Sequence, residues 1–572
     1  MQKKIEYGSD VIADILRRQG IEYVTYNPGS TITGIYDSLM YFDDRKMPKP
    51  ILCCHEEIAI AIAHGYAKVS GKAMAVLLHS NVGLQHASMA IFNAWCDRVP
   101  LLIVGGIGPM DSEKRRPWID WIHTSHSQTS IINDYVKWHD EPYSLAAAEE
   151  SIQRAFYLTN TEPKAPTYVS IDVSIQERLI GNNIYRFRTK FHTKTHPAQA
   201  DPETIKEIAR GLLKARFPII IVDYMGKNKS AVNDLIQLAE RLDVAVLDCG
   251  GRYNFPNTHE LCMTGQEEYI LKKSDYILAL DVQDLQGFFD THHYTKQTKL
   301  FHVTLSDYLL SSWSSEYQKF CSQAEYVYAD SAFFLKELIL WISNNNESIM
   351  DSLEKKKYLR TLHNKQRKLW IEEATSQFRS NPITMPALLY QIWDSIKHEN
   401  WSLVGFGSVL IGQWARKLWE FKKPDSYFGF SGGAGLGYGL GAAIGASLAL
   451  IKRDIICINL QTDGDLLFTP SALWTMAHYN VPVLNIVFNN KSYNNTKEHS
   501  KRTALLRKRD VNEDSGSDLY DPIVNYAKLA RSFGIKAFNA IDDFQNIKPT
   551  LDNAISYIKV NKKPVLIDII FE

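Results

Sequence analysis

Hydrophobic residues in the first third of the chain gather in short runs that alternate with longer amphipathic stretches. The runs are bounded by turn residues, a pattern that is typical of buried strands. They lie at 21–26, 51–54, 73–78, 101–105 and 167–173. Because helices are expected between the runs, the pattern predicts a parallel sheet with helices on both faces.

The same alternation returns twice further along the chain. A second set of runs lies at 217–222, 245–247, 276–280 and 300–303, and a third at 402–404, 455–460, 483–488 and 565–570. A basic, irregular stretch at 186–200 and a polar segment at 346–375, expected to be a solvated linker helix, separate the sets. Pro202, with Asp201 as N-cap, is expected to open the first helix of the second set. The chain is therefore predicted to be α/β, with three doubly wound parallel-sheet domains at 1–185, 200–345 and 376–572.

Composition agrees with this organisation and narrows the function. A chain of 572 residues predicts about three domains. Its 64 Lys and Arg residues balance 64 Asp and Glu residues, which argues against a general nucleic-acid binder. Seven cysteines are too few for a disulfide framework and favour a reduced, cytoplasmic protein. The N-terminus has no apolar signal core.

One segment has the length and the lack of charge of a membrane-spanning helix. Residues 428–451 carry no charge and are long enough to cross a bilayer. Eight of these 24 residues are glycine, however, and a polar, basic segment follows. The segment is therefore interpreted as a Gly-rich loop that leads into a buried helix, with no membrane contact.

Polar residues that follow two strands of the third set carry the candidate chemistry. Asp463 comes directly after one predicted strand and Asn490 after the next. Open α/β sheets bind ligands at the carboxyl ends of their strands, and carboxylate and amide oxygens suit Mg²⁺. Gly464 would let the backbone approach a phosphate, and the helix that follows would favour an anion. The spacing predicts a metal–diphosphate site at this edge of the sheet.

The motifs around these residues resemble the thiamine diphosphate (ThDP) enzymes of the acetolactate synthase and benzoylformate decarboxylase group. They are Thr462-Asp463-Gly464 followed by Asn489-Asn490, and His55-Glu56 followed by Gly65-Tyr66-Ala67. The resemblance covers nearly the whole chain and names its domains pyrimidine-binding, central and diphosphate-binding. Two positions depart from the family pattern. Thr462 replaces a glycine, and Asp465 stands where a small residue is usual, which puts a negative charge near the expected diphosphate.

The resemblance implies where each part of the cofactor lies. Asp463, Asn490 and the main-chain carbonyl of Ser492 would hold Mg²⁺. Leu436 would be the wedge that bends the cofactor, and the Ala434 carbonyl would face the aminopyrimidine ring. The other implied cofactor contacts are Gly407, Ser408, Gly464 and Asp465. Some relatives bind FAD or an ADP-like group in the central domain, and no residue pattern here points to either.

The first block would supply catalytic groups. By register Glu56, rather than Glu57, matches the family glutamate, whose carboxyl favours the imino tautomer that removes the thiazolium C2 proton. Ser30 and His79 match a benzoylformate decarboxylase pattern and would move protons on the substrate. The segment 115–128 would line the substrate pocket, with His123, His126 and Gln128 as candidates, or would pack a subunit interface through its tryptophans. A basic stretch at 497–509 is expected to be either a mobile lid that attracts an anionic substrate or a solvated loop.

The resemblance implies C–C bond cleavage or formation on a 2-oxo acid, by a decarboxylase or an acetolactate-synthase-like carboligase. Two alternatives remain open: an acyloin or aldehyde lyase that releases no carbon dioxide, and a degenerate member that acts as a binding or regulatory subunit. An NAD-dependent enzyme is disfavoured because the Gly-rich loop lacks the acidic ribose contact downstream. Family active sites form between two chains, so a dimer or tetramer is expected.

Overall fold

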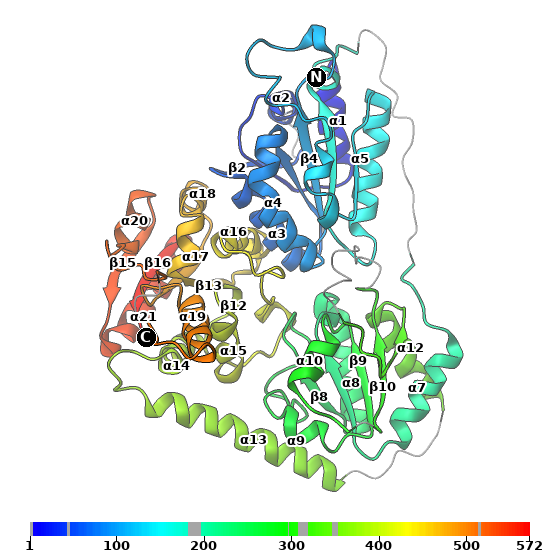
Figure 1. The fold of residues 1–572 in the computed structure, drawn as a ribbon, viewed down its shortest axis with the longest axis vertical. Coiled ribbons are helices and arrows are strands. Elements are labelled where there is room, and N and C mark those ends of the chain that lie inside the picture. The colour runs from blue at the N-terminus through cyan, green and yellow to red at the C-terminus, as the bar shows by residue number, and fades with distance from the viewer. Residues whose placement is uncertain are drawn as a thin grey trace.

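The computed structural model describes residues 4–42, 46–180, 196–295, 297–306, 319–345, 353–512 and 516–571. Three parallel sheets, each flanked by helices, occupy three separate regions of the molecule (Figure 1). Their strands fall within 1–185, 200–345 and 376–572 respectively. The predicted α/β class with three parallel sheets is confirmed.

The first sheet has six strands in the order β2-β1-β3-β4-β6-β5. These are β1 (Tyr23–Tyr26), β2 (Lys49–Leu52), β3 (Met74–Leu78), β4 (Leu101–Ile107), β5 (Trp138–Asp140) and β6 (Thr167–Asp172). The longer helices around it are α1 (Gly8–Arg18), α2 (Thr33–Tyr41), α3 (Glu56–Ser70), α4 (Ser80–Cys96) and α5 (Leu145–Asn160).

The central sheet has the order β11-β10-β9-β7-β8. Its strands are β7 (Pro218–Val222), β8 (Ala245–Asp248), β9 (Tyr276–Leu280), β10 (Lys299–Val303) and β11 (Ala324–Val327). Its longer helices are α7 (Pro202–Lys214), α8 (Lys229–Leu242) and α12 (Ser331–Asn344). Asp201 caps α7 as predicted, because its carboxylate accepts from the backbone N–H of Glu203 and Thr204. Most of the irregular stretch at 186–200 lies outside the described residues.

The third sheet has the order β12-β13-β14-β16-β15. Its strands are β12 (Trp401–Phe406), β13 (Ile456–Thr462), β14 (Val483–Asn489), β15 (Lys536–Ile541) and β16 (Val565–Ile570). Its helices include α14 (Met385–Ile396), α15 (Val409–Leu418), α16 (Tyr438–Leu450), α17 (Asp463–Phe468), α18 (Ala472–His478), α19 (Asn494–Leu506), α20 (Tyr526–Ser532) and α21 (Phe544–Asn561). The linker helix is α13 (Leu353–Ser376), which runs from the central region to the third along the bottom of Figure 1.

Three strands, β5, β11 and β15, have no counterpart among the predicted strands. Each lies at an edge of its sheet. Edge strands face solvent on one side, and the middle of β15, for example, is exposed at Asn539 and Ala540. Their sequences therefore lack the continuous apolar run that marks a central strand of a parallel sheet.

The uncharged segment 428–451 forms a loop followed by α16, as expected. Helix α16 packs against α3 of the first domain, and the two helices lie side by side in Figure 1. A Cβ added to Gly65 would lie 2.0 Å from the Ala442 carbonyl oxygen, and one on Gly445 would lie 1.8 Å from that of Ile62. Glycine is thus required for this close helix contact. The apolar sequence of α16 reflects burial between two domains.

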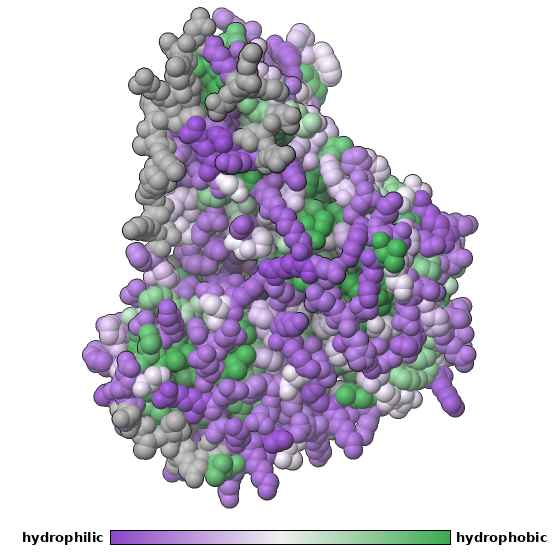
Figure 2. All heavy atoms as spheres, turned by 180° about the vertical axis from the view of Figure 1, so that it is seen from behind, coloured by the Kyte–Doolittle hydropathy of each residue, from purple (hydrophilic) through white to green (hydrophobic). Residues whose placement is uncertain are grey.

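No helix in the described part of the chain combines the length and apolarity needed to cross a membrane. On the face shown in Figure 2, hydrophilic residues predominate, and hydrophobic residues form separate small groups.

A buried ion cluster joins the three domains. The Asp97 carboxylate, at the end of α4, is fully buried and lies 2.6 Å from the Arg252 guanidinium of the central domain. The Lys68 ammonium, also at 2.6 Å, and the His64 ring, at 2.7 Å, contact its other oxygen from α3. Lys68 further donates to the Phe430 carbonyl, just before the Gly-rich loop.

The charges of this cluster depend on one another. Although burial opposes it, Arg252 and Lys68 hold the pKa of Asp97 well below its usual range. Burial lowers the pKa of His64 to about 4, so the ring is neutral at pH 7. The cluster thus contains one carboxylate and two cations, and the carboxylate stabilises both buried cations as they stabilise it.

The substitution Asp97→Asn should destabilise the protein by about 3–5 kcal/mol, because it leaves Lys68 and Arg252 buried without a counter-charge. A lower urea midpoint, followed by circular dichroism, would show this. As a control, Asp111→Asn removes an exposed carboxylate 3.6 Å from Lys114 and should change stability by less than about 0.5 kcal/mol. Equal midpoints for the two variants would contradict the proposed role of the cluster.

Candidate active site

Strand order brings the predicted metal residues together at the carboxyl edge of the third sheet. Strands β13 and β14 are parallel neighbours, with Thr462 paired to Phe488. Asp463 begins α17 directly after β13, and Asn490 follows β14. A cavity of about 690 Å³ opens at this edge. The predicted residues that line it are Gly407, Ser408, Leu436, Asp463, Gly464, Asp465, Asn490 and Ser492.

Asp463 has the environment of a cation ligand. Its side chain is only 2% exposed, and one carboxylate oxygen accepts from the Gly464 N–H at 2.9 Å. The other oxygen, Oδ2, is buried and has no hydrogen-bond partner among the described residues. Burial raises the pKa of Asp463 to about 6, because the charged form has lost its water. A cation in the cavity would supply the missing partner, so the oxygen ligands present here fit Mg²⁺.

The Asp465 carboxylate, which the sequence placed near the expected diphosphate, makes hydrogen bonds within the protein. Its carboxylate accepts from the Gly437 N–H at 2.7 Å and from the Gln461 amide. Gly437 precedes α16, so Asp465 anchors the start of that helix. This interaction accounts for a carboxylate at a position where the family has a small residue. A direct contact between Asp465 and a diphosphate stays a prediction.

The Gly-rich loop is fixed by the first domain. The Asn93 side chain of α4 accepts from the Gly435 N–H at 3.0 Å and donates to the Gly435 carbonyl at 3.2 Å. This places Leu436 on the cavity wall. Ala434 is not among the lining residues, but its φ of +56° is unusual for a residue with a side chain. Such strain is concentrated at functional sites, which is consistent with the predicted role of this loop.

Glu56 lies in the first turn of α3, where His55 caps the helix by accepting from the Glu57 N–H. The Glu56 side chain is 7% exposed, and its carboxylate lies 3.3 Å from the His86 Nδ1. A Cβ on Gly83 would lie 3.1 Å from Glu56 Oε1 and 3.2 Å from the Cβ of His79. Gly83 thus lies between Glu56 and His79, which brings two of the predicted catalytic side chains close together.

His79 is held as a neutral base. Its Nδ1 lies 2.8 Å from the Thr31 hydroxyl, which leaves Nε2 for a ligand. Burial lowers the pKa of His79 to about 4, and the nearby His123 and Arg116 act in the same direction. The chain turns closely around the ring, because a Cβ on Gly29 would lie 2.3 Å from it. Ser30, the next residue, is exposed beside the same group.

The predicted pocket residues of the segment 115–128 differ in their positions relative to His79. The His123 ring lies 4.6 Å from that of His79, whereas His126 is exposed. Gln128 is fully buried and donates to the Gly106 carbonyl and the Tyr168 hydroxyl, which makes it part of the sheet's packing. Trp118 and Trp121 are 77% and 68% exposed in the single chain. Substrate contact by these residues, or packing against another subunit, stays a prediction.

Arg116 belongs to the predicted segment 115–128 but is not among the candidates that the sequence singled out. Its guanidinium is paired with the buried carboxylate of Asp120 at 2.8 Å, and its Nη2 lies 3.5 Å from the Ser30 hydroxyl. Arg116 and Asp120 are four residues apart, and oppositely charged side chains at this spacing can form an ion pair. The spacing could therefore have indicated the ion pair, but it does not indicate that Arg116 lies close to Ser30.

The first domain contributes no lining residue to the cavity at the third sheet within one chain. Every residue that lines the 690 Å³ cavity comes from positions 384–571, so Glu56, His79 and Ser30 are not among them. The neighbour Glu57 does face the third domain, since a Cβ on Gly437 would lie 2.6 Å from its Oε1. Burial, together with Asp465, raises the pKa of Glu57 to about 7.

The basic stretch at 497–509 forms mostly helix, so the predicted solvated loop is wrong, whereas its role as a lid stays a prediction. It belongs to α19, whose residues favour helix and where Lys501 pairs with Glu498 at 2.8 Å. Lys497 is paired with Asp518 at 2.9 Å. Arg502 lines the cavity, which gives the site one basic residue from this helix.

Comparisons with known proteins agree with this geometry. Residues 7–133 match the N-terminal TPP binding domain of thiamine pyrophosphate enzymes, and residues 408–569 match the C-terminal TPP binding domain. The chain is 24% identical over 575 residues to benzoylformate decarboxylase of Pseudomonas aeruginosa, covering 97% of each chain. It is also 24% identical over 548 residues to the acetolactate synthase large subunit of Buchnera aphidicola, covering 92% of this chain and 88% of that one.

A solved structure shares the fold over its full length. It is the thiamine diphosphate-dependent 4-hydroxybenzoylformate decarboxylase of Rhodococcus jostii RHA1, with a TM-score of 0.76, 21% identity and 99% of each chain covered. Both cofactor-binding domains and the three-sheet architecture therefore agree with the family that the sequence motifs indicated. The chain belongs to the thiamine diphosphate-dependent enzymes of the acetolactate synthase and benzoylformate decarboxylase group.

Proposed function

We propose that this enzyme uses ThDP and Mg²⁺ to cleave or form a C–C bond next to the carbonyl of a 2-oxo acid. The observation that carries the proposal is the buried Oδ2 of Asp463, which lacks a partner in a cavity that Asn490 and Ser492 also line. When bound, ThDP would supply a nucleophilic carbon and an electron sink. The similarity to a benzoylformate decarboxylase and to an acetolactate synthase large subunit supports either a decarboxylase or a carboligase.

Residues of this chain form two half-sites, one for the metal and cofactor and one for proton transfer. Asp463, Asn490 and the Ser492 carbonyl would hold the metal, and Leu436 would lie against the cofactor. Glu56, in its largely buried position, would accept a hydrogen bond from, or donate one to, the aminopyrimidine ring of the bound cofactor. His79 is neutral at pH 7, so its Nε2 can accept a proton from the substrate and return it, while Ser30 orients the substrate.

The active site requires a second copy of the chain. Glu56 and the 690 Å³ cavity lie in different places within one chain, although both are needed to bind a single bent cofactor. In a twofold dimer the first domain of one chain can face the third domain of its partner, which unites the half-sites. A dimer is therefore the minimum active unit.

Asp463→Asn should weaken binding of ThDP and Mg²⁺ by at least about tenfold, since even outer-sphere changes at metal sites cost that much. Isothermal titration would measure the affinity. In Asp465→Asn, the side-chain oxygen still accepts from Gly437, so the affinity should change much less. A metal site elsewhere would leave Asp463→Asn unaffected, and absence of wild-type binding at millimolar cofactor would refute the cofactor assignment.

The protein should release carbon dioxide from at least one of pyruvate, 2-oxobutanoate and benzoylformate, only when ThDP and Mg²⁺ are both present. Product analysis by mass spectrometry separates a decarboxylase, which yields an aldehyde, from a synthase, which yields a 2-hydroxy ketone or acid. Cleavage of an acyloin without release of carbon dioxide from any 2-oxo acid would instead support the lyase alternative.

Mixing Glu56→Gln with Asp463→Ala chains should restore C2 proton exchange of ThDP to about a quarter of the wild-type value. Random pairing gives one intact site in each mixed dimer, built from Glu56 of one chain and Asp463 of the other. Each variant alone should be at least about 100-fold slower than wild type. Glu57→Gln serves as the matched control and should retain exchange. Recovery no greater than the sum of the two variants would place the whole site within one chain.

A further inference from the structure

Three side chains that can bind a transition metal lie together at the start of α3. They are His55, which caps the helix, Glu56 in its first turn, and His86 of the neighbouring helix α4. One ligand atom of each residue lies within 4.8 Å of those of the other two. None of the three lines the cavity that contains Asp463, so the group is separate from the predicted Mg²⁺ site.

Two of these side chains already have the separation of ligands on one ion. The Nδ1 of His86 lies 3.3 Å from a carboxylate oxygen of Glu56. Two ligands at about 2.0–2.1 Å from a tetrahedral Zn²⁺ lie about 3.3 Å from each other. The His55 ring is stacked on the His86 ring, with 4.9 Å between ring centres. A shift of about 1.5 Å would bring a His55 nitrogen to the distance of a third ligand.

The Glu56 carboxylate has no permanent counter-charge. It is largely buried, and no Lys or Arg nitrogen lies within 4.0 Å of it among the described residues. Its only hydrogen-bond partner in that part of the chain is the His86 ring. A buried carboxylate without a cation is costly, so a divalent ion at this position would stabilise it.

The kinds of ligand atom favour a transition metal over Mg²⁺. Two imidazoles and one carboxylate suit Zn²⁺, Co²⁺ and related ions, whereas Mg²⁺ prefers oxygen ligands alone. The His86 side chain is 60% exposed, so an ion can reach the group directly from solvent.

Metal binding would change one existing interaction. The His55 Nδ1 accepts from the Glu57 N–H at 3.1 Å. A neutral imidazole has one nitrogen lone pair, so coordination through either ring nitrogen would end this hydrogen bond. The loss of a side-chain cap would reduce the apparent metal affinity only about fivefold.

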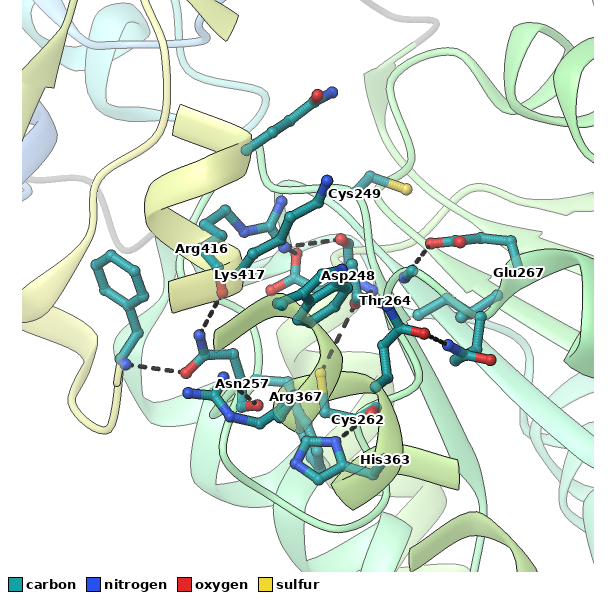
Figure 3. Close-up of a pocket in the computed structure, with 18 of the residues that line it drawn as sticks. Asp248, Cys249, Asn257, Cys262, Thr264, Glu267, His363, Arg367, Arg416 and Lys417 are labelled. Carbon is teal, nitrogen blue, oxygen red and sulfur yellow. Dashed lines mark hydrogen bonds and ion pairs between the residues drawn. The ribbon is translucent and has the colours of Figure 1, made fainter. Parts of the chain in front are cut away.

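The arrangement is particular to this place in the described part of the chain, where no other three His, Cys, Asp or Glu side chains are grouped closely enough to hold a metal ion. The cavity between the central domain, α13 and α15 also contains such side chains, but they have other partners (Figure 3). The His363 Nδ1 donates to the Cys262 carbonyl at 2.9 Å, and Asp248 is paired with Arg416.

We propose that His55, Glu56 and His86 form a site for a transition-metal dication, such as Zn²⁺, in the cofactor-free protein. Three protein ligands would leave one tetrahedral position for water. Coordination would keep the Glu56 carboxylate deprotonated and turned toward His86. If Glu56 contacts the aminopyrimidine ring, as the proposed function requires, the metal and ThDP compete for this carboxylate, and each lowers the affinity for the other.

The binding test uses Zn²⁺ and Co²⁺ with the untagged full-length protein, free of ThDP and Mg²⁺. Calorimetry should give one Zn²⁺ per chain, and bound Co²⁺ should show the visible absorption of a tetrahedral ion. His55→Asn and His86→Asn should each weaken Zn²⁺ binding by at least about tenfold. Asparagine is a good N-cap, so α3 should be retained in His55→Asn.

The matched control is His398→Asn, which removes an exposed histidine of the third domain and should bind Zn²⁺ normally. Equal affinity in the wild type, His55→Asn and His86→Asn would indicate adventitious binding only and would overturn the site. Absence of Zn²⁺ binding at submillimolar concentration would do the same. Because ThDP takes no part in this test, its outcome is independent of the proposed function.

The competition test measures ThDP affinity at fixed Mg²⁺, with and without the Zn²⁺ concentration that saturates the wild type. ThDP binding should weaken by at least about fivefold in the wild type and stay unchanged in His86→Asn. Zn²⁺ that displaced Mg²⁺ at Asp463 or bound the diphosphate would affect both proteins equally, and that result would refute the competition. Absence of ThDP binding without Zn²⁺ would refute the proposed function and the competition together, but not the metal site.

Discussion

The buried carboxylate of Asp97 is the constraint on which the arrangement of domains depends. One side chain at the end of α4 contacts Arg252 of the central domain and Lys68 of α3, and Lys68 also reaches the backbone before the Gly-rich loop. A charge buried this deeply is tolerated only when its partners are fixed around it. The ion cluster therefore fixes the positions of the three domains relative to one another. The positions of the half-sites in these domains are fixed with them.

The contact between α3 and α16 also fixes the position of the first domain relative to the third. Helix α3 begins with Glu56, and α16 begins directly after the loop that contains Leu436. Gly65 and Gly445 let the two helices approach so closely that neither could slide without a clash. Helix α3 and the Gly-rich loop are thus positioned by one interface, even though their proposed cofactor contacts belong to different half-sites.

Electrostatics divide these half-sites into distinct chemical environments. Asp463, the proposed metal ligand, is a carboxylate whose pKa is raised by burial, whereas His79, in the proposed catalytic half-site, is kept neutral by burial and by the nearby His123 and Arg116. The first environment would favour binding of a cation beside Asp463, and the second leaves His79 in the neutral form, which can accept a proton. Arg116, fixed by Asp120 beside Ser30, adds a permanent positive charge where a substrate carboxylate would approach.

The sequence by itself determined the fold class, most central strands and the membership in the ThDP enzymes, because buried strands and cofactor motifs are local patterns. It did not reveal β5, β11 and β15, whose edge positions relax the need for apolar residues. Only the tertiary structure decided that Asp465 anchors α16, that Gln128 belongs to the core and that Arg116 lies beside Ser30. Those roles depend on contacts between side chains that are far apart in the sequence. The spacing of residues along the chain does not predict such contacts.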